Sequence, residues 1–318
     1  MAGDELSVSS SGIRLRALVT GATGFIGSRL ARRLVDENWD LHVIVRADSK
    51  LDRIADLPSV VHVDDGRMPM HEIVRTAAPD VCFHLAGYVV GAHKHSDISS
   101  LIADNLLFGT RLADALAANG HCDVVNAGSY WQNAGGRAYH PVALYAATKQ
   151  AFQDLLQFYV ESNCLRVVTL KFFETYGPGD HRPKLINLML QAAATGRSID
   201  VSPGDQFVDL VHVDDAVEAC LAAARALQRP EQWSSMSYSV TTGAPMRLRD
   251  LVNRIEQIIG QDVPVEWGRR AYRWREMMVP WDVAPVVPDW TPAVSLESGI
   301  GAMWENLVGP DLGRRLKG

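Results

Sequence analysis

A phenol and an ammonium stand one helical turn apart in the segment SYWQNAGGRAYHPVALYAATKQA, residues 129–151. Tyr145 and Lys149 are four residues apart, so on a helix both side chains leave the same face and can meet at one point. A phenol with an ordinary pKa near ~10 is a poor acid or base at neutral pH. We expect the ammonium of Lys149, together with the positive charge of an oxidised nicotinamide, to lower the pKa of Tyr145, which then acts as an acid in reduction and a base in oxidation.

One further residue extends this pair into a candidate catalytic set. Ser129 follows an apolar run at Asp123 to Ala127 that is typical of a strand, and its hydroxyl can hold a substrate oxygen. Lys149 can also hydrogen-bond the ribose of a nicotinamide cofactor. A Tyr-x-x-x-Lys pair alone is common on exposed helices, so the catalytic interpretation depends on what lies upstream.

Upstream, three glycines separate an apolar strand from a helix in LVTGATGFIGSRLARRLV, residues 18–35. The first glycine permits a tight turn, the second lets the backbone approach a pyrophosphate, and the third lets the helix pack on the strand. The helix N-terminus offers N–H donors to the anion. This context favours dinucleotide binding over a merely tight turn, and it predicts a binding loop made of Gly21, Thr23, Gly24, Phe25, Ile26 and Gly27.

The end of the second strand indicates which dinucleotide binds. NAD-binding proteins commonly carry an acidic residue there, whereas LHVIVRADSK has Arg46, followed by Ser49 and Lys50. A guanidinium suits a 2′-phosphate, so we expect NADP, with NAD as the alternative; a solvated basic loop is the other interpretation of this segment. Asp65 can accept a hydrogen bond from the adenine amino group, and Asp64 is an equally near candidate.

From Leu15 onwards, β-rich runs alternate with helical patterns, which predicts βαβ units and a doubly wound parallel sheet, an α/β Rossmann fold. After Tyr176 the Gly- and Pro-rich stretch YGPGDHRPK breaks this rhythm. We therefore expect a dinucleotide-binding domain and a smaller C-terminal substrate lobe. The predicted division is a flexible tail at 1–13, the dinucleotide-binding domain at 14–181 with about 207–228, and the substrate lobe at 182–206 and 229–318.

Composition argues against a membrane-spanning, secreted or nucleic-acid-binding protein. The 318 residues are 47% hydrophobic with a formal net charge of −6, and no apolar run is long enough to cross a bilayer. No secretory signal and no basic run with interleaved aromatics is visible, so we expect a cytoplasmic protein without a nucleic-acid or membrane partner. The four scattered cysteines fit reduced thiols better than disulfides or a metal site, and we expect no metal.

These motifs together resemble the extended short-chain dehydrogenase/reductases, the NAD-dependent epimerase/dehydratase family that acts on nucleotide sugars. The resemblance runs from VTGATGFIG through FHLAG, DNLLFGTRLADAL, LYAATK, LKFFETYGPGD and FVDLVHVDDAVEA to PDWTPAVSLESGI. It implies a nucleotide-sugar substrate and often a homodimer formed through helices near 105–119 and 142–159. It also implies that Asn105 steadies the sheet centre, that Tyr176 lies near the nicotinamide, and that the dinucleotide is lined by His84, Leu85, Ala86 and Gly87.

Two departures concern the substrate. The family usually has Asn where LKFFET has Glu174, and often Arg where FVDL has Val208; both would contact the substrate's diphosphate. The cations left to hold it are Arg182, Lys184, and Arg273 or Arg275. A solvated or helix-packing cation is the alternative for each.

The residues after Ser129 separate the reactions of the family. Its 4,6-dehydratases carry an Asp-Glu pair there, whereas this chain has Tyr130, Trp131 and Gln132. The segment is most similar to reductases of 4-keto sugars such as the CDP-abequose and CDP-paratose synthases. We expect an NADPH-dependent reduction of the 4-keto group of a nucleotide-linked 6-deoxy sugar. The alternatives are a nucleotide-sugar 4-epimerase with tightly bound NAD, a reductase of a non-nucleotide ketone, and a non-catalytic redox sensor.

Overall fold

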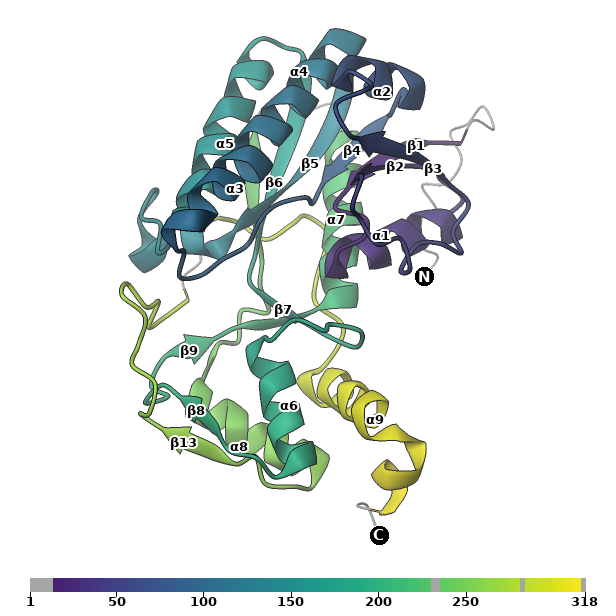
Figure 1. The fold of residues 1–318 in the computed structure, drawn as a ribbon. Helices are drawn as coiled ribbons and strands as arrows, with labels where there is room; N and C mark the ends of the chain where they lie inside the picture. Colours follow the sequence, from purple (N-terminus) through teal and green to yellow (C-terminus); the bar gives the residue numbers. More distant parts are fainter. Residues whose placement is uncertain (1–13, 230–234, 281–283, 316–318) are drawn as a thin grey trace.

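In the computed structural model, the alternating pattern of the N-terminal half folds into a seven-stranded parallel sheet (Figure 1). The structure describes residues 14–229, 235–280 and 284–315, so the predicted tail at 1–13 lies outside the described residues. The strand order is β11-β6-β5-β4-β1-β2-β3. In chain order the strands are β1 (Arg16–Thr20), β2 (Asp40–Arg46), β3 (Ser59–Asp64), β4 (Val81–His84), β5 (Cys122–Ser129), β6 (Leu165–Phe172) and β11 (Met236–Val240).

Helices cover both faces of the sheet, because strands such as β1 are apolar on both sides. Ala17 and Val19 belong to a core with α1 (Phe25–Asp36) and α7 (Val213–Leu227). Leu18 belongs to the core of the opposite face. There the covering helices are α2 (Met70–Ala77), α4 (Phe108–Asn119) and α5 (Leu144–Glu161), with α3 (Ile98–Ile102) and the π-helical turn η2 (Ala103–Leu107) leading into α4. This arrangement confirms the predicted doubly wound fold.

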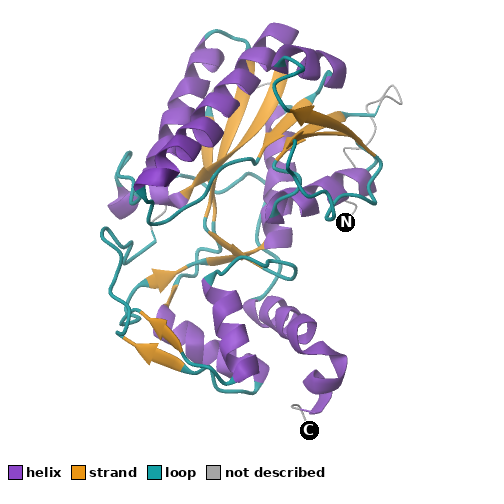
Figure 2. Cartoon of the chain, in the orientation of Figure 1, coloured by secondary structure: helices purple, strands orange, loops and turns teal. Residues whose placement is uncertain are grey.

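The smaller half has its own core below the sheet (Figure 2). Its helices are α6 (Leu185–Thr195), α8 (Leu248–Ile259) and α9 (Leu296–Arg315). Three short strand pairs complete it: β7 (Glu174–Tyr176) with β10 (Leu210–His212), β9 (Phe207–Val208) with β12 (Met246–Arg247), and β8 (Ile199–Val201) with β13 (Val265–Trp267). Within the described ranges, every helix is too short or too polar to span a bilayer.

The chain passes between the halves more often than the predicted division allows. Helix α7 packs on the sheet, but β9 pairs in the smaller half although the prediction assigned about 207–228 to the dinucleotide-binding domain. The prediction also assigned 229–318 to the substrate lobe, whereas β11 joins the sheet beside β6, and Ser239 bridges to Val286. The edge of β6 presents unpaired backbone groups, and β11 satisfies them.

All strands of the main sheet are parallel, so their carboxyl ends meet at one edge, which faces the smaller half. At this edge the glycine turn follows β1, Leu85 to Gly87 follow β4, Ser129 ends β5, and Phe173 and Glu174 follow β6. The fold thus brings together segments that are up to about 150 residues apart in the sequence.

Candidate active site

The glycine turn has the backbone geometry that a dinucleotide diphosphate needs. Gly21 has φ +73°, and a Cβ there would lie 2.8 Å from Leu85 C and Ala86 N. A Cβ on Gly27 would lie 2.1 Å from Gly21 O, so both positions require glycine. Gly24 is the N-cap of α1, where no side chain caps the helix and the first turn carries no acidic residue. The first N–H groups of α1 are thereby left for an anion.

The adenosine end of the dinucleotide pocket lies between the glycine turn, the ends of β2 and β3, and the start of α4. Of the predicted residues, this pocket is lined by Gly21, Thr23, Gly24, Arg46, Ser49, Leu85, Ala86 and Gly87. Asp64 lines it, whereas Asp65 turns to accept a hydrogen bond from Arg67 N at 2.9 Å. Lys50 is not among the lining residues.

Charges of both signs meet at this end. The guanidinium of Arg46 is largely exposed and donates to Asp104 Oδ2 at 3.2 Å, while Ser49 Oγ accepts from Arg46 N at 3.1 Å. Arg111 Nη2 lies 4.0 Å from Asp64 Oδ1. Sequence reasoning missed Asp104 and Arg111, although their helical spacing with Leu107 and Phe108 places all four on one face toward the pocket.

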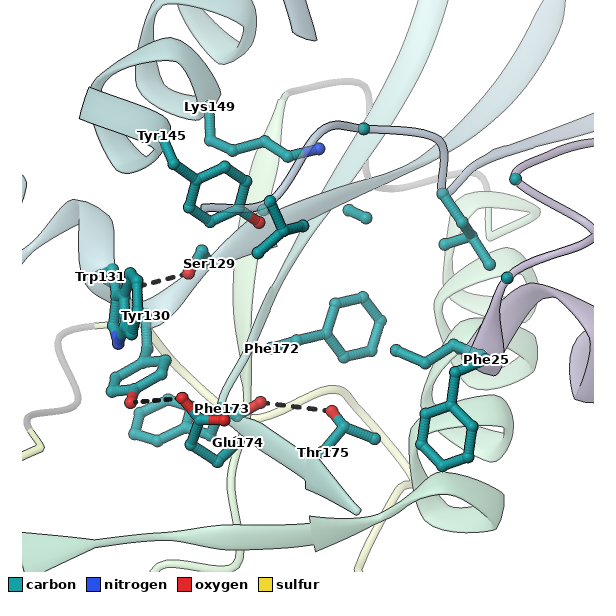
Figure 3. A pocket seen from close by; sticks show the side chains of 18 of the residues that line it. Phe25, Ser129, Tyr130, Trp131, Tyr145, Lys149, Phe172, Phe173, Glu174 and Thr175 are labelled. Atoms are coloured by element: carbon teal, nitrogen blue, oxygen red, sulfur yellow. Dashed lines mark hydrogen bonds between the residues drawn. The ribbon is translucent and has the colours of Figure 1, made fainter. Parts of the chain in front are cut away.

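The three predicted catalytic side chains share one pocket at the carboxyl edge of the sheet (Figure 3). Ser129 ends β5, and Tyr145 and Lys149 project from the first turns of α5; all three are buried. Ser129 Oγ accepts a hydrogen bond from Trp131 N at 3.3 Å, and Ser129 N donates to Gln132 Oε1 at 2.8 Å. These bonds fix the hydroxyl at the strand end.

Burial determines the protonation of Tyr145 and Lys149 in this pocket. It raises the pKa of the Tyr145 phenol above its usual value, and the neighbouring Ser129 hydroxyl opposes only part of this rise. It lowers the pKa of Lys149 to about 8. In the chain by itself, burial penalises the phenolate more than its neighbours favour it. The expectation that Lys149 and an oxidised nicotinamide together lower the pKa of Tyr145 concerns the cofactor complex and stays a prediction. Tyr145 is held as a phenol, the form that donates a proton.

Asn105 connects the catalytic helix to the loop after β4. Its Oδ1 accepts from Tyr88 N at 2.7 Å, and its Nδ2 donates to Tyr88 O at 3.0 Å and to Thr148 Oγ1 at 2.9 Å. Thr148 Oγ1 in turn donates to Tyr145 O at 2.7 Å. A Cβ on Gly87 would lie 3.1 Å from both Asn105 Oδ1 and Lys149 Nζ. Asn105 thus lies in the π-helical turn η2 and positions the first turn of α5 rather than the sheet centre.

The opposite wall of the pocket follows β6. Tyr130 stacks on Phe173 with ring centroids 4.6 Å apart, and its hydroxyl donates to Glu174 Oε1 at 3.3 Å. Lys184 Nζ lies 2.9 Å from Glu174 Oε2. Burial alone would raise the pKa of Glu174, but Lys184 and the other donors outweigh it and hold that pKa below its usual value. Glu174 is therefore ionised at neutral pH.

The remaining predicted substrate residues are already paired with carboxylates. Arg182 lines the pocket and binds both oxygens of Asp180, at 2.7 and 2.8 Å. Arg273 lies over the ring of Trp131, 4.5 Å from its centroid, and binds Glu276 at 2.6 and 3.0 Å. It reaches Trp131 from the smaller half, so the two halves meet beside the pocket.

The structure places Tyr176 away from this pocket. Its ring packs against His212, with centroids 5.4 Å apart, and it lines a separate pocket in the smaller half. Phe172 and Phe173 line the catalytic pocket instead, and sequence reasoning missed them because they read as ordinary core residues of a buried strand. Phe25, Ile26 and Gly27 also line it. Among the residues that the structure describes, no three His, Cys, Asp or Glu side chains converge as a metal ion would require.

Several known proteins with similar sequences are named for reactions of nucleotide sugars. The chain is 25% identical over 267 residues to the CDP-abequose synthase of Yersinia pseudotuberculosis, covering 84% of this chain and 92% of that protein. It is 24% identical over 333 residues to a probable UDP-glucuronate 4-epimerase of Rhizobium meliloti (strain 1021), covering 92% and 96%. These relatives agree with the resemblance to nucleotide-sugar reductases and epimerases that the motifs indicate.

A solved structure supports the same fold. The UDP-glucuronic acid 4-epimerase of Bacillus cereus, in complex with UDP-glucuronic acid and NAD, superposes with a TM-score of 0.80 at 19% identity, covering 92% of this chain and 99% of that one. The model of the NAD dependent epimerase/dehydratase family matches residues 17–235, well over half of the chain. With its glycine turn, its Ser-Tyr-Lys set and this match, the chain belongs to the NAD-dependent epimerase/dehydratase family of extended short-chain dehydrogenase/reductases.

Proposed function

We propose that the protein reduces the 4-keto group of a nucleotide-linked 6-deoxy sugar with NADPH. The observation that carries this proposal is that Ser129, Tyr145 and Lys149 are buried together in one pocket, with aromatic and amide side chains rather than carboxylates after Ser129. A reductase needs a proton donor at this place, whereas a dehydratase also needs an acid and base pair. The similarity to CDP-abequose synthase supports the same assignment.

The side chains then have separate tasks. NADPH, when bound, supplies the hydride that the ketone carbon receives. Ser129 holds the ketone oxygen and Tyr145 protonates it as negative charge develops there. Lys149, which approaches the loop at Gly87, binds the cofactor ribose and, as a cation near Tyr145, favours the phenolate that each turnover leaves.

The cofactor preference rests on the adenosine end. Arg46, Ser49 and Arg111 line it and offer two guanidinium groups and a hydroxyl to a 2′-phosphate. Asp64 and Asp104 line the same end, and acidic groups suit the free ribose hydroxyl of NAD. This second observation favours the alternative function, a nucleotide-sugar 4-epimerase that retains NAD.

The fate of the cofactor tests the two functions. We expect the purified protein to oxidise one NADPH for each nucleotide-linked 4-keto-6-deoxy sugar consumed. The loss of the nicotinamide absorbance measures this oxidation. Interconversion of 4-hydroxy epimers without added cofactor and without net NADPH oxidation would establish the epimerase instead. The proposed roles of Ser129, Tyr145 and Lys149 are the same in either outcome, because both reactions need the same proton and hydride geometry.

We also propose that the protein is a cytoplasmic homodimer. Apolar side chains lie exposed on α3 and α5, namely Ile102, Leu155 and Phe158, of which Phe158 is 66% exposed. A second copy that covers this face would remove them from water. The four cysteines are free thiols, three of them buried, which supports a reducing compartment. Light scattering of the protein and of Phe158→Asp tests the dimer: we expect a dimer that the substitution converts to a monomer.

A further inference from the structure

The substrate side of the pocket contains a fixed negative charge. Glu174 follows β6 and lines the same pocket as Ser129 and Tyr145. In Figure 3 its side chain lies on the opposite wall of the pocket from Tyr145 and Lys149, with Phe172 between the two walls. A substrate whose reacting oxygen contacts Ser129 and Tyr145 therefore extends toward this carboxylate.

Two side chains hold Glu174 in place. Lys184 Nζ binds one carboxylate oxygen at 2.9 Å, the Tyr130 hydroxyl donates to the other at 3.3 Å, and Tyr130 is itself stacked on Phe173. The Glu174 side chain retains 25% exposure and that of Lys184 37%. A carboxylate with one donor on each oxygen still has acceptor capacity for a further hydrogen bond.

Lys184 pairs with Glu174 on one side only. Its ammonium binds Oε2, whereas Oε1 accepts from the neutral hydroxyl of Tyr130. Arg182 and Arg273 each bind a carboxylate of their own, Asp180 and Glu276. A substrate group that approaches Oε1 therefore meets a carboxylate oxygen whose partner is a neutral hydroxyl.

We propose that Glu174 is a specificity-determining residue that selects nucleotide sugars without a charge on the sugar ring and excludes uronates. This inference rests on the proposed nucleotide-sugar function and names the sugar class that the site takes. A neutral sugar can donate a hydroxyl hydrogen to the free lone pairs of Glu174. A uronate carboxylate has no such hydrogen at neutral pH and brings a like charge into a partly buried site, which costs roughly tenfold or more in affinity.

A matched pair of ligands tests the proposal without turnover. UDP-glucose and UDP-glucuronate differ in the carboxylate of the sugar, so the ratio of their dissociation constants isolates its effect. With the cofactor-loaded protein in calorimetry, we expect UDP-glucose to bind about tenfold or more tightly than UDP-glucuronate. A ratio near one, or tighter binding of UDP-glucuronate, overturns the proposal.

Variants assign the effect to Glu174. Glu174→Gln keeps the size of the side chain and an oxygen for Tyr130 but removes the charge, so the ratio should fall to about threefold or less. Glu174→Asp keeps the charge and should keep most of the ratio. Asp56→Asn changes the net charge of the protein by the same amount at an exposed site paired with Arg32, and it should leave the ratio unchanged. An unchanged ratio in Glu174→Gln, with its melting temperature intact, also overturns the proposal.

These measurements are independent of the reaction. If the protein proves to be an epimerase or fails to oxidise NADPH, the ratio of binding constants still reports on Glu174. If the ratio is near one while a 4-keto-6-deoxy sugar is reduced, the specificity proposal fails and the proposed function stands.

Discussion

The two ends of the active site are built by different means. At the dinucleotide end, Gly21 and Gly27 allow backbone to pack against backbone, and any side chain at Gly27 would collide with Gly21 O. At the substrate end, the wall consists of side-chain ion pairs, Glu174 with Lys184 and Arg182 with Asp180. Backbone packing leaves few alternatives, whereas an ion pair can be exchanged for another pair of side chains. Substitutions can therefore change the substrate wall more readily than the glycine turn.

The largest effect on turnover should come from Tyr145, which lies between the two ends. Tyr145→Phe removes the proton donor but no contact of the glycine turn, so we expect turnover to fall by roughly 10²–10⁴ while cofactor affinity stays near normal. Lys149→Met should lower both turnover and cofactor affinity, because the proposed roles of Lys149 are to bind the cofactor ribose and to favour the phenolate of Tyr145. Steady-state kinetics and cofactor titration check this; full turnover in Tyr145→Phe at saturating substrate would show that another group is the acid.

A second test compares two glycines of the same turn. Gly27→Ala places a Cβ 2.1 Å from Gly21 O, and the backbone must move, which should destabilise the protein by about 3 kcal/mol or more. Gly24→Ala is the matched control, because its Cβ would meet only Gly21 O at 3.1 Å. We expect Gly24→Ala to fold normally, and denaturant unfolding distinguishes the two. Equal stability of both variants contradicts the backbone account of this end.

Arg46 is the exception at the dinucleotide end, since it acts through a side chain. If it binds a 2′-phosphate, Arg46→Asp should remove about 1.5 kcal/mol or more of NADPH affinity and leave NADH affinity nearly unchanged. The neighbouring Lys50→Asp makes the same change in charge outside the pocket lining and should keep the preference. Equal affinity of the unmodified protein for NADPH and NADH refutes the assignment.

The smallest expected effect is a pH dependence to which one histidine pair contributes, beside His84, whose pKa burial lowers to about 3, and His212, whose pKa burial also lowers. His42 Nδ1 and His62 Nε2 lie 3.0 Å apart with stacked rings on β2 and β3, and burial lowers the pKa of both below the unfolded value. The unfolded chain therefore binds more protons below about pH 6.5, so stability is full above that pH and falls as the pH decreases.

Urea unfolding between neutral pH and about pH 5.5 measures the total loss of stability, to which this pair should contribute about 1 kcal/mol. His62→Gln keeps a polar side chain at the position but removes one titrating ring, so its stability should depend less on pH. The same pH dependence in both proteins would falsify the assignment to this pair.

Much of the dinucleotide end could be predicted because it depends on local signals. The glycine spacing, Ser129 at a strand end and the four-residue separation of Tyr145 and Lys149 are each visible within one segment. Arg111 and Asp104 were not found, because they belong to a helix that the fold brings against β2 and β3. The raised pKa of Tyr145 was also missed, because its burial depends on a hydrophobic cluster whose members, such as Leu101 and Met277, are distant in sequence.

The substrate end was harder to predict for the same reason. The sequence identified Glu174, Arg182, Lys184 and Arg273 as candidates, but the partner of each could not be inferred. Glu174 pairs with a lysine ten residues ahead, across a Gly- and Pro-rich loop, and Arg273 meets Trp131 from the other half. Such pairs depend on loop geometry, which carries no periodic signal.

The return of β11 to the sheet limits how sequence segments of this fold can be exchanged by recombination. After α7 the chain adds Met236–Val240 beside β6, re-enters the smaller half, and touches the sheet again where Val286 bridges Ser239 (Figure 1). The smaller half is thus made of interleaved segments and has no single boundary at which recombination could exchange it between relatives. One continuous exchange of sequence that replaced all of the smaller half would therefore also replace β11, an edge strand of the main sheet.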